Sequence, residues 1–268
     1  MVIVSLSFDD GRYDNYTNVL PILRKYDIPA TFNITTAYID KRIESAELCC
    51  DNLPMSINNI KEISKCKLIE LACHGDRHSN DLKDICTGQM LLKKWAGLNE
   101  RYKMGFASPH SRMKRKDAES IKNELISNNF FYVRGGENIS CNDYIRRISR
   151  KLSRVFPLPI LYRFAYEKSL VNNFEKFYLN SVPVTRKHTY AQVMELVKYA
   201  LKSEKHIIFM FHSILKREEP FYENICAWDY RNFEKLCFYL SKLRDENKIY
   251  IMKTCDMYYA INKSLVYL

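Results

Sequence analysis

The sequence predicts an α/β fold in which a single domain closes as a distorted, parallel (β/α)7-8 barrel. Apolar segments rich in β-branched residues alternate with segments of helical periodicity along the 268 residues, and this alternation is typical of a parallel sheet with crossover helices. About eight strands are expected, the number that closes this type of barrel. No internal repeat or linker divides the chain, so we expect one domain over 1–268.

The predicted strands and helices follow one another in order. The strands begin near residues 2, 30, 67, 105, 130, 177, 206 and 249. Apolar residues at helical spacing predict helices over 15–26, 55–64, 84–103, 118–128, 190–203 and 230–246. The stretch at about 137–176 is rich in basic residues, and we expect it to be an insertion into the barrel.

Charge and cysteine usage indicate the partner and the compartment. A net charge of +11 favours an anionic partner, such as an acidic glycan, a phospholipid surface or a phosphate group. No nucleic-acid-binding motif is present, so no nucleic acid is expected. The nine cysteines form no Cys-x-x-Cys pair, which favours reduced thiols in a reducing compartment. The chain opens on a strand without a basic leader, and no apolar run reaches the ~18 residues of a membrane span. We therefore expect a cytoplasmic protein, either free or peripheral at the inner membrane face.

The first strand, Val2–Phe8, leads into two adjacent carboxylates, Asp9 and Asp10, and then Gly11. Charges at the end of a buried strand are costly to keep. Successive strand residues point to opposite sides, so one carboxylate can face a site while its neighbour takes another role. The alternative is a strand followed by an ordinary Asp-Gly turn.

Titratable side chains also follow several later strands. The carboxyl ends of the strands are the edge at which parallel barrels build their sites, and four of the six histidines lie at such ends. The residues at these positions are Asp9, Asp10, His74, His78, His110, Arg134 and His212.

Asp10, His74 and His78 form a candidate set of metal ligands. The two histidines are four residues apart, so one helical turn would put both imidazoles on one face. A site with two histidines and one carboxylate leaves positions open for water and substrate. We expect one divalent metal ion, with Zn as the first choice and Co, Ni or Fe as alternatives. Otherwise the histidines cap a helix or hold a structural ion.

Asp9 and His212 are candidates for proton transfer. A carboxylate beside the metal can take a proton from water as that water attacks a carbonyl. His212 follows the late apolar strand and can protonate a leaving amine. A single histidine after an apolar strand is otherwise a structural residue.

Five ordered motifs resemble those of the polysaccharide deacetylases, the NodB-homology carbohydrate esterases of the family 4 type. The resemblance runs from residue 3 to about residue 215, and the rest fits the closing helix and strand of that family. The motifs are Ser7–Gly11, Ala30–Phe32, His74–His78, Phe106–Pro109 and Met210–His212.

The resemblance implies a distorted (β/α) barrel and metal-dependent removal of an N- or O-acetyl group from a sugar. Substrate contacts are implied for Pro109 and His110, the latter through its backbone N–H at the oxyanion. The implied roles of the remaining residues are base for Asp9, metal ligands for Asp10, His74 and His78, and acid for His212.

Two positions depart from the family pattern. An arginine that often pairs with the base is replaced by Ala107, and an acidic residue on the next strand is replaced by Arg134. Arg134 either orients Asp9 from the other side or lies on the surface beside a Gly-Gly turn.

We therefore expect a metal-dependent hydrolase that removes N-acetyl or O-acetyl groups from a glycan or amino sugar. A first alternative is a deacetylase or deformylase of a lipid-linked sugar at the cytoplasmic membrane face. Others are a metal-free amide hydrolase of the same fold, and an inactive glycan-binding barrel.

The basic segment 142–168 is a candidate membrane contact. Seven basic residues stand against two acidic ones, and Ile145, Ile148, Leu152 and Val155 recur at helical spacing. Basic residues opposite an apolar stripe are typical of an interfacial helix. The alternative is a barrel helix that packs this apolar stripe on the core.

Overall fold

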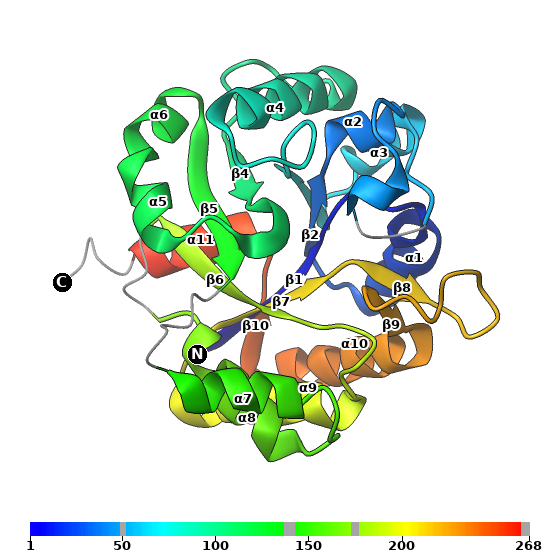
Figure 1. Ribbon diagram of the computed structural model, residues 1–268, viewed down its shortest axis with the longest axis vertical. Helices are drawn as coiled ribbons and strands as arrows, with labels where there is room; N and C mark the ends of the chain where they lie inside the picture. Colours follow the sequence, from blue (N-terminus) through cyan, green and yellow to red (C-terminus); the bar gives the residue numbers. More distant parts are fainter. Residues whose placement is uncertain (49–51, 137–142, 173–176, 264–268) are drawn as a thin grey trace.

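The computed structural model describes residues 1–48, 52–136, 143–172 and 177–263 (Figure 1). Seven parallel strands close into a barrel, and an eighth is added at the first strand. In order of position along the chain, these strands are β1 (Val2–Phe8), β2 (Ala30–Ile34), β3 (Ile69–Cys73), β4 (Met104–Ala107), β5 (Phe130–Gly136), β6 (Tyr178–Pro183), β7 (Ile207–Phe211) and β10 (Ile249–Ile251). The predicted α/β barrel and its strands are confirmed.

The distortion of the barrel is centred on β1, which has three neighbours. Val4 pairs with Ile207 of β7 and with Ile251 of β10, so these two strands lie on opposite edges of β1. The edge that carries β10 at Val2–Val4 is taken over by β2 at Ser7–Phe8. The strand β10 therefore separates β1 from β2 at the amino end of the barrel, and the two join only near the carboxyl end.

Helices surround the strands (Figure 1). They are α1 (Leu20–Tyr26), α2 (Thr36–Ile39), α3 (Ile57–Ile63), α4 (Leu82–Ala96), α5 (Arg115–Ser120), α6 (Lys122–Ser127), α7 (Tyr144–Leu152), α8 (Pro159–Tyr166), α9 (Tyr190–Ser203), α10 (Tyr230–Asp245) and α11 (Thr254–Lys263). Short helical turns are η1 (Asn15–Val19), η2 (Ser45–Leu48), η3 (Pro109–Ser111) and η4 (Glu167–Ser169). A small parallel pair, β8 (Ser213–Leu215) and β9 (Ala227–Asp229), follows β7.

Three predicted helices have different bounds. The helix expected over 84–103 ends at Ala96, because Gly97 adopts φ +67° and closes it as a left-handed cap. The helix expected over 118–128 is divided into α5 and α6 at Ile121, whose backbone is not helical. The helix expected over 15–26 begins with the wider turn η1.

The amino end of the barrel is closed by α11. Met257 and Ile261 of this helix pack on Ile3 and Ile208, which belong to β1 and β7. The larger core lies between the strands and the surrounding helices. No helix in the described ranges combines the length and apolarity needed to span a bilayer. Since one end of the barrel is filled by α11, the carboxyl end is left for chemistry.

Candidate active site

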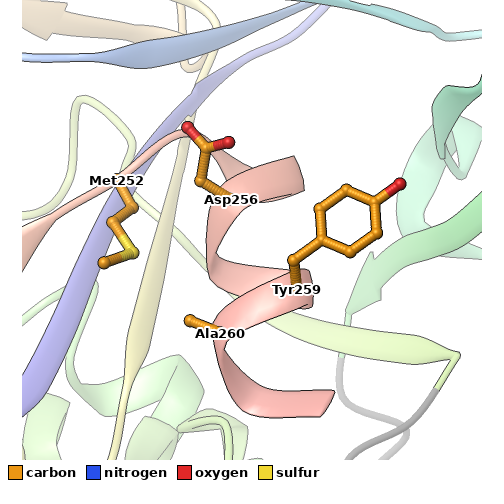
Figure 2. Close-up of a pocket in the computed structure, with 4 residues that line it drawn as sticks. All are labelled: Met252, Asp256, Tyr259 and Ala260. Atoms are coloured by element: carbon orange, nitrogen blue, oxygen red, sulfur yellow. The ribbon is translucent and has the colours of Figure 1, made fainter. Parts of the chain in front are cut away.

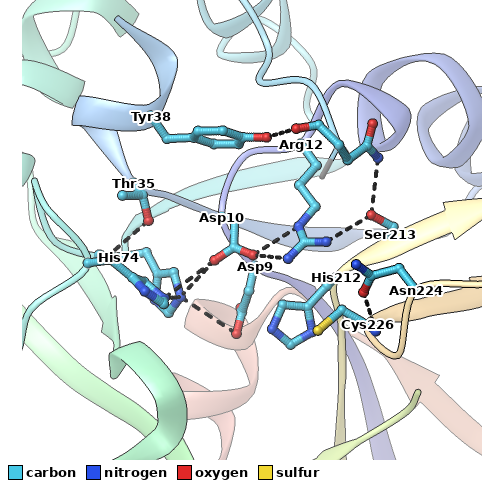
Figure 3. A network of polar contacts seen from close by, with 12 residues as sticks. Asp9, Asp10, Arg12, Thr35, Tyr38, His74, His212, Ser213, Asn224 and Cys226 are labelled. Atoms are coloured by element: carbon cyan, nitrogen blue, oxygen red, sulfur yellow. Dashed lines mark hydrogen bonds and ion pairs between the residues drawn. The ribbon is translucent and has the colours of Figure 1, made fainter. Parts of the chain in front are cut away.

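The carboxyl ends of three strands bring the predicted acid, base and metal-ligand residues together. Asp9 and Asp10 follow β1, His74 follows β3 and His212 follows β7 (Figure 3). The amide of Asp9 donates to the carbonyl of Phe211 at 2.9 Å, which fixes the end of β1 beside the end of β7. All of these side chains except that of His212, which is partly exposed, are buried.

Asp10, His74 and His78 present three ligand atoms to one point. Oδ1 of Asp10 lies 3.5 Å from Nε2 of His74 and 3.5 Å from Nε2 of His78. The two Nε2 atoms are 3.2 Å apart. Metal–ligand bonds of ~2.0–2.1 Å in a tetrahedral site place neighbouring ligand atoms about 3.4 Å apart. The spacing of these three atoms therefore fits a zinc-sized ion.

The hydrogen bonds around this trio also fit a metal site. Within the described ranges, Oδ1 of Asp10 is buried and has no hydrogen-bond partner. Nδ1 of His74 is 2.7 Å from the carbonyl of Ala107, so this nitrogen carries the proton and Nε2 is left as a free ligand. Burial and the neighbouring His74 lower the pKa of His78 to about 3. His78 is thus neutral near pH 7, the form that binds metals.

Arg12 holds the metal-facing orientation of Asp10. Its Nε and Nη2 atoms donate to Oδ2 of Asp10 at 2.9 and 2.6 Å, and Nη1 donates to the hydroxyl of Ser213 at 3.0 Å. Burial opposes ionisation of Asp10, but Arg12 and His74 lower its pKa well below the usual range. The result is a carboxylate with one oxygen anchored and the other turned toward the histidines.

The histidine pair lies on a loop, so the predicted helical turn is wrong. Residues 74–78 follow β3 directly, with Gly75 at φ +81° and His78 at φ +59°. A side chain at Gly75 would place its Cβ 2.5 Å from Oδ2 of Asp84. Asp84, on α4, accepts hydrogen bonds from the amides of Asp76, Arg77 and Ser79 at 2.8–3.1 Å. This carboxylate and the two left-handed residues bring the imidazoles together.

Asp9 is paired with a cation on the far side of the barrel. Nη2 of Arg134 donates to both carboxylate oxygens of Asp9 at 2.7 and 2.8 Å, and Nδ2 of Asn33 donates to Oδ1 at 2.7 Å. Arg134 is only 1% exposed, so the surface location considered as its alternative is wrong. Burial raises the pKa of Asp9, but Arg134 and the nearby histidines outweigh this effect and lower it. Asp9 is therefore ionised.

His212 lies beside the two carboxylates on the opposite wall (Figure 3). Its backbone carbonyl accepts a hydrogen bond from Nδ2 of Asn15 at 2.8 Å. Among the described residues, nothing hydrogen-bonds to its buried Nδ1. Burial lowers the pKa of this imidazole, and the charges of Asp10 and Asp9 oppose that shift.

Pro109 and His110 form the rim next to His78. They belong to η3, in which His110 adopts φ +53°. The exposed ring of His110 packs edge-on against that of His78, with the centroids 4.4 Å apart. Asp10, His78 and His110 are thus non-glycine residues with left-handed backbone, a strained conformation that is concentrated at functional sites.

Sequence reasoning missed the residues that support the site. Asn33 is a polar residue in the mostly apolar, buried strand β2, and that contrast is the signal that could have identified it. Arg12 lies among the polar residues 9–15, where no such contrast marks it. Asp14 accepts a hydrogen bond from the Ile214 amide at 2.6 Å and another from Asn52. Burial raises the pKa of Asp14 to about 7. No short pattern links Asp14 to Ile214, which lies 200 residues away.

One open pocket lies at the other end of the molecule. Figure 2 shows its lining side chains Met252, Asp256, Tyr259 and Ala260, all on or next to α11. Lys253 pairs with Asp256 at 3.4 Å there, and the lining is mostly apolar. This pocket is separated from the candidate site by the length of the barrel.

Comparison with known proteins connects this site to a family. A family model described as polysaccharide deacetylase matches residues 2–129. A comparison with curated proteins gives no match. Among solved structures, a Mycobacterium smegmatis protein provisionally described as a polysaccharide deacetylase aligns with a TM-score of 0.56 and 13% identity, over 98% of this chain and 91% of that one. This match shows a shared fold.

Two other solved structures give lower scores. IcaB from Ammonifex degensii aligns with 22% identity and a TM-score of 0.39, over 48% of this chain and 57% of that one. A mutant of the peptidoglycan deacetylase PdaC from Bacillus subtilis aligns with 10% identity and a TM-score of 0.49, over 98% and 92%. The match to IcaB thus spans less than two thirds of that protein. Residues 2–129, which carry Asp9, Asp10, His74 and His78, are thus similar to the polysaccharide deacetylase family.

Proposed function

We propose that this protein is a metal-dependent deacetylase that removes an N-acetyl or O-acetyl group from a glycan or amino sugar. The observation that carries the proposal is the convergence of Oδ1 of Asp10 and Nε2 of His74 and His78 within 3.2–3.5 Å, beside the ionised pair of Asp9 and Arg134. A divalent ion held there would act as a Lewis acid on the acyl carbonyl and lower the pKa of bound water. Zinc suits two imidazoles and one carboxylate, and Co, Ni or Fe would use the same ligands.

The protein groups divide the proton transfers between the two walls of the barrel. Asp9 is kept ionised by Arg134 and accepts a proton from water as the water oxygen bonds to the acyl carbon. His212, on the other side, donates a proton to the nitrogen as the carbon–nitrogen bond breaks. The products are acetate and the free amine; for an O-acetyl group, the leaving oxygen takes the proton and the free hydroxyl is formed. The backbone N–H of His110 stabilises the negative charge on the carbonyl oxygen, and Pro109 shapes the adjoining rim.

The proposal covers residues 1–268 as one deacetylase domain, with 137–176 as an insertion between β5 and β6. We place the protein in the cytoplasm. The six cysteines in the described ranges, Cys66, Cys73, Cys86, Cys226, Cys237 and Cys255, are all free thiols, as a reducing compartment favours.

A second candidate keeps the chemistry and changes the substrate to a lipid-linked sugar, from which an acetyl or formyl group is removed at the inner membrane face. The observation that favours it is the apolar side of α7, which faces solvent: Ile145 is 68% exposed. A protein that acts on a soluble glycan has no need for such an exposed apolar surface.

The test is metal content together with acetate and formate release over chitooligosaccharides, poly-N-acetylglucosamine, peptidoglycan fragments and lipid-linked sugars. His78→Ala should lose stoichiometric metal, because it removes one of three protein ligands. Asp9→Asn and His212→Ala should bind metal but lower the rate by roughly 10²–10⁴-fold, the usual range for a general acid or base.

Asp117→Asn, which alters an exposed carboxylate of α5, is the control and should match the parent protein. Retained metal and full activity in His78→Ala would refute the ligand assignment. Glycan binding without acyl release on any substrate would identify an inactive binding barrel instead.

A further inference from the structure

The helix α7 is amphipathic, but unlike an ordinary barrel helix it turns its apolar side to solvent and its polar side to the protein. Its inner face carries Arg146 and Ser149, both buried, while Ile145 and Ile148 point to solvent. The alternative considered from the sequence, that this apolar stripe packs on the core, is therefore wrong. An outward apolar stripe on a helix is typical of a surface that binds a partner.

The exposed apolar surface continues beyond α7 into the turn and the next helix. Val155 is 70% exposed, slightly more than Ile145, the most exposed aliphatic residue of α7. Pro157 lies between the two helices and Pro159 begins α8. Tyr162 of α8 is buried, while its neighbours on the outer side are not. We call this surface the α7–α8 apolar face. It consists of Tyr144, Ile145, Ile148, Leu152, Val155, Phe156, Leu158, Ile160 and Phe164.

Buried polar contacts fix α7 in this orientation. Nη2 of Arg146 and Nε of Arg150 each donate to the carbonyl of Ala165 on α8 at 3.3 Å. The Arg150 guanidinium also lies 4.7 Å from the centre of the Tyr166 ring. Rotating α7 to bury its isoleucines would expose Tyr166 and break these charge-assisted bonds. The apolar face is therefore part of the folded protein.

Three exposed residues beside the apolar face carry positive charges that no ion pair offsets within the described ranges. Arg147, Lys151 and Arg154 are exposed, and none of them pairs with a carboxylate in the described part of the chain. The segment 142–168 has seven basic and two acidic residues. A second copy of this chain would bring two such cationic surfaces together, which is unfavourable. An anionic lipid surface offers complementary charge and an apolar layer beneath it.

The turn between α7 and α8 lies at the carboxyl end of the barrel, which is also the end that holds the candidate active site. Nε2 of Gln192, at the start of α9, donates to the carbonyl of Ser153 at 2.8 Å. The hydroxyl of Tyr162 donates to the carbonyl of Pro183, the last residue of β6, at 3.1 Å. Contact through this turn would therefore bring the mouth of the barrel close to the surface.

We propose that the α7–α8 apolar face docks on an anionic membrane, with Arg147, Lys151 and Arg154 on the headgroups and the apolar side chains in the interfacial layer. The attachment is peripheral and reversible. It is independent of turnover, so its failure would leave the proposed chemistry untouched.

The test is co-sedimentation of the full chain with phosphatidylcholine vesicles that do or do not contain phosphatidylserine. Binding should require phosphatidylserine and weaken when the salt concentration is raised about tenfold, which shortens the screening length about threefold. Hydrogen exchange on the bound protein should show slowed exchange over residues 144–158 and not over α4.

Two double variants, each with a control on α4, separate the electrostatic and the apolar contributions to membrane binding. Arg147→Glu with Lys151→Glu should lower the vesicle partition coefficient by at least about 25-fold, since each lost basic contact weakens it about fivefold. Lys83→Glu with Lys94→Glu, an equal charge change on exposed residues of α4, should have a far smaller effect. Ile145→Ser with Val155→Ser should abolish binding, while Met90→Ser, at an exposed apolar residue of α4, should not.

All these positions are exposed, so the variants should fold, which circular dichroism can verify. No binding to anionic vesicles at low salt would overturn the proposal. So would binding that Ile145→Ser with Val155→Ser leaves intact. A parent protein that is dimeric in sedimentation, and monomeric in that variant, would show that a second copy covers the face.

Discussion

At the scale of single residues, the candidate site depends on two arginines that each anchor one carboxylate. Arg134 contacts Asp9 through Nη2, and Arg12 contacts Asp10 through Nε and Nη2. Both arginines are almost fully buried. A buried charge pair breaks at a high cost when one partner is removed, so these contacts fix the protonation and the orientation of the carboxylates.

Removal of Arg134 should change the pH dependence of the reaction. Arg134 lowers the pKa of Asp9, and the base must be ionised, so Arg134→Ala should raise that pKa and move the acidic limb of kcat/KM to higher pH. Arg134→Lys should restore part of the shift. Ser181→Ala is the control, because it removes the 3.2 Å contact to Nη1 of Arg134 and the bond from this hydroxyl to the Gly135 carbonyl but leaves the contacts of Arg134 with Asp9 intact. A large loss of activity with an unmoved limb would assign Arg134 to substrate binding.

Replacement of Arg12 should weaken metal binding. Arg12→Gln removes both donors to Oδ2 of Asp10 and leaves that carboxylate free to turn. Loss of such supporting contacts typically costs 10–100-fold in metal affinity, roughly the effect expected here. Competition with a chromogenic chelator measures it, with Arg24→Gln on α1 as an exposed control. Tighter binding in Arg12→Gln would mean that repulsion between the arginine and the ion outweighs positioning.

At the scale of elements, the start of α9 couples the barrel to the α7–α8 turn. Gln192 is buried, and its Oε1 accepts from the Thr189 amide at 2.8 Å while its Nε2 reaches the carbonyl of Ser153. One side chain thus serves as part of a helix cap and as a tether. The tether matters because Val155 and Phe156 on this turn belong to the exposed apolar face.

Gln192→Ala should therefore lower the stability of the protein more than loss of the helix cap alone would. We expect the free energy of unfolding to fall by about 2–4 kcal/mol, from a lost cap of about 1 kcal/mol and buried groups left unpaired. Thr189→Ala removes the cap hydroxyl only and should cost about 1 kcal/mol. Chemical denaturation gives both values, and hydrogen exchange should accelerate at 153–158 only in Gln192→Ala. Equal costs for the two variants would contradict the tether.

The sequence predicts the presence and order of strands and helices better than it predicts which side of each one faces the protein interior. Strands such as Ile207–Phe211, which is apolar throughout, and Val2–Phe8, which is apolar except for two serines, are buried and ordered as their composition predicts. The periodicity of α7 identifies a helix but not which side is inward, because that depends on Ala165 and Tyr166 from the next helix. Likewise, the spacing of His74 and His78 fits a helical turn, and only the contacts of Asp84 make it a loop.

At the scale of the whole molecule, the two ends of the barrel have separate tasks. The carboxyl end holds the ionisable residues, and the amino end is filled by α11 and the side chains around it. The sequence placed the ionisable residues at the correct end, because each of them lies near or just after the carboxyl end of a strand. It gave no indication that β10 would enter beside β1, since strand order depends on contacts between distant segments.

A change at the amino end should alter stability without altering catalysis. Met257 is completely buried against Ile3 and Ile208, so Met257→Ala should cost about 2–5 kcal/mol, the range for such cavities. Below the unfolding transition, kcat should equal that of the parent. Thermal unfolding and acetate release on the same sample measure both quantities. A matching loss of kcat in the folded variant would show that the two ends are coupled.

The three neighbours of β1 have a consequence for synthesis on the ribosome. β1 is translated before its partners in β7 and β10, which are made more than 200 residues later. Until those segments emerge, this mostly apolar strand has only β2 to pair with, and a chain in that state is prone to aggregate. Long-range pairing of this kind is also slow. The strand that delivers Asp9 and Asp10 is therefore completed last, and nascent chains should depend on a chaperone until residue 251 has been added.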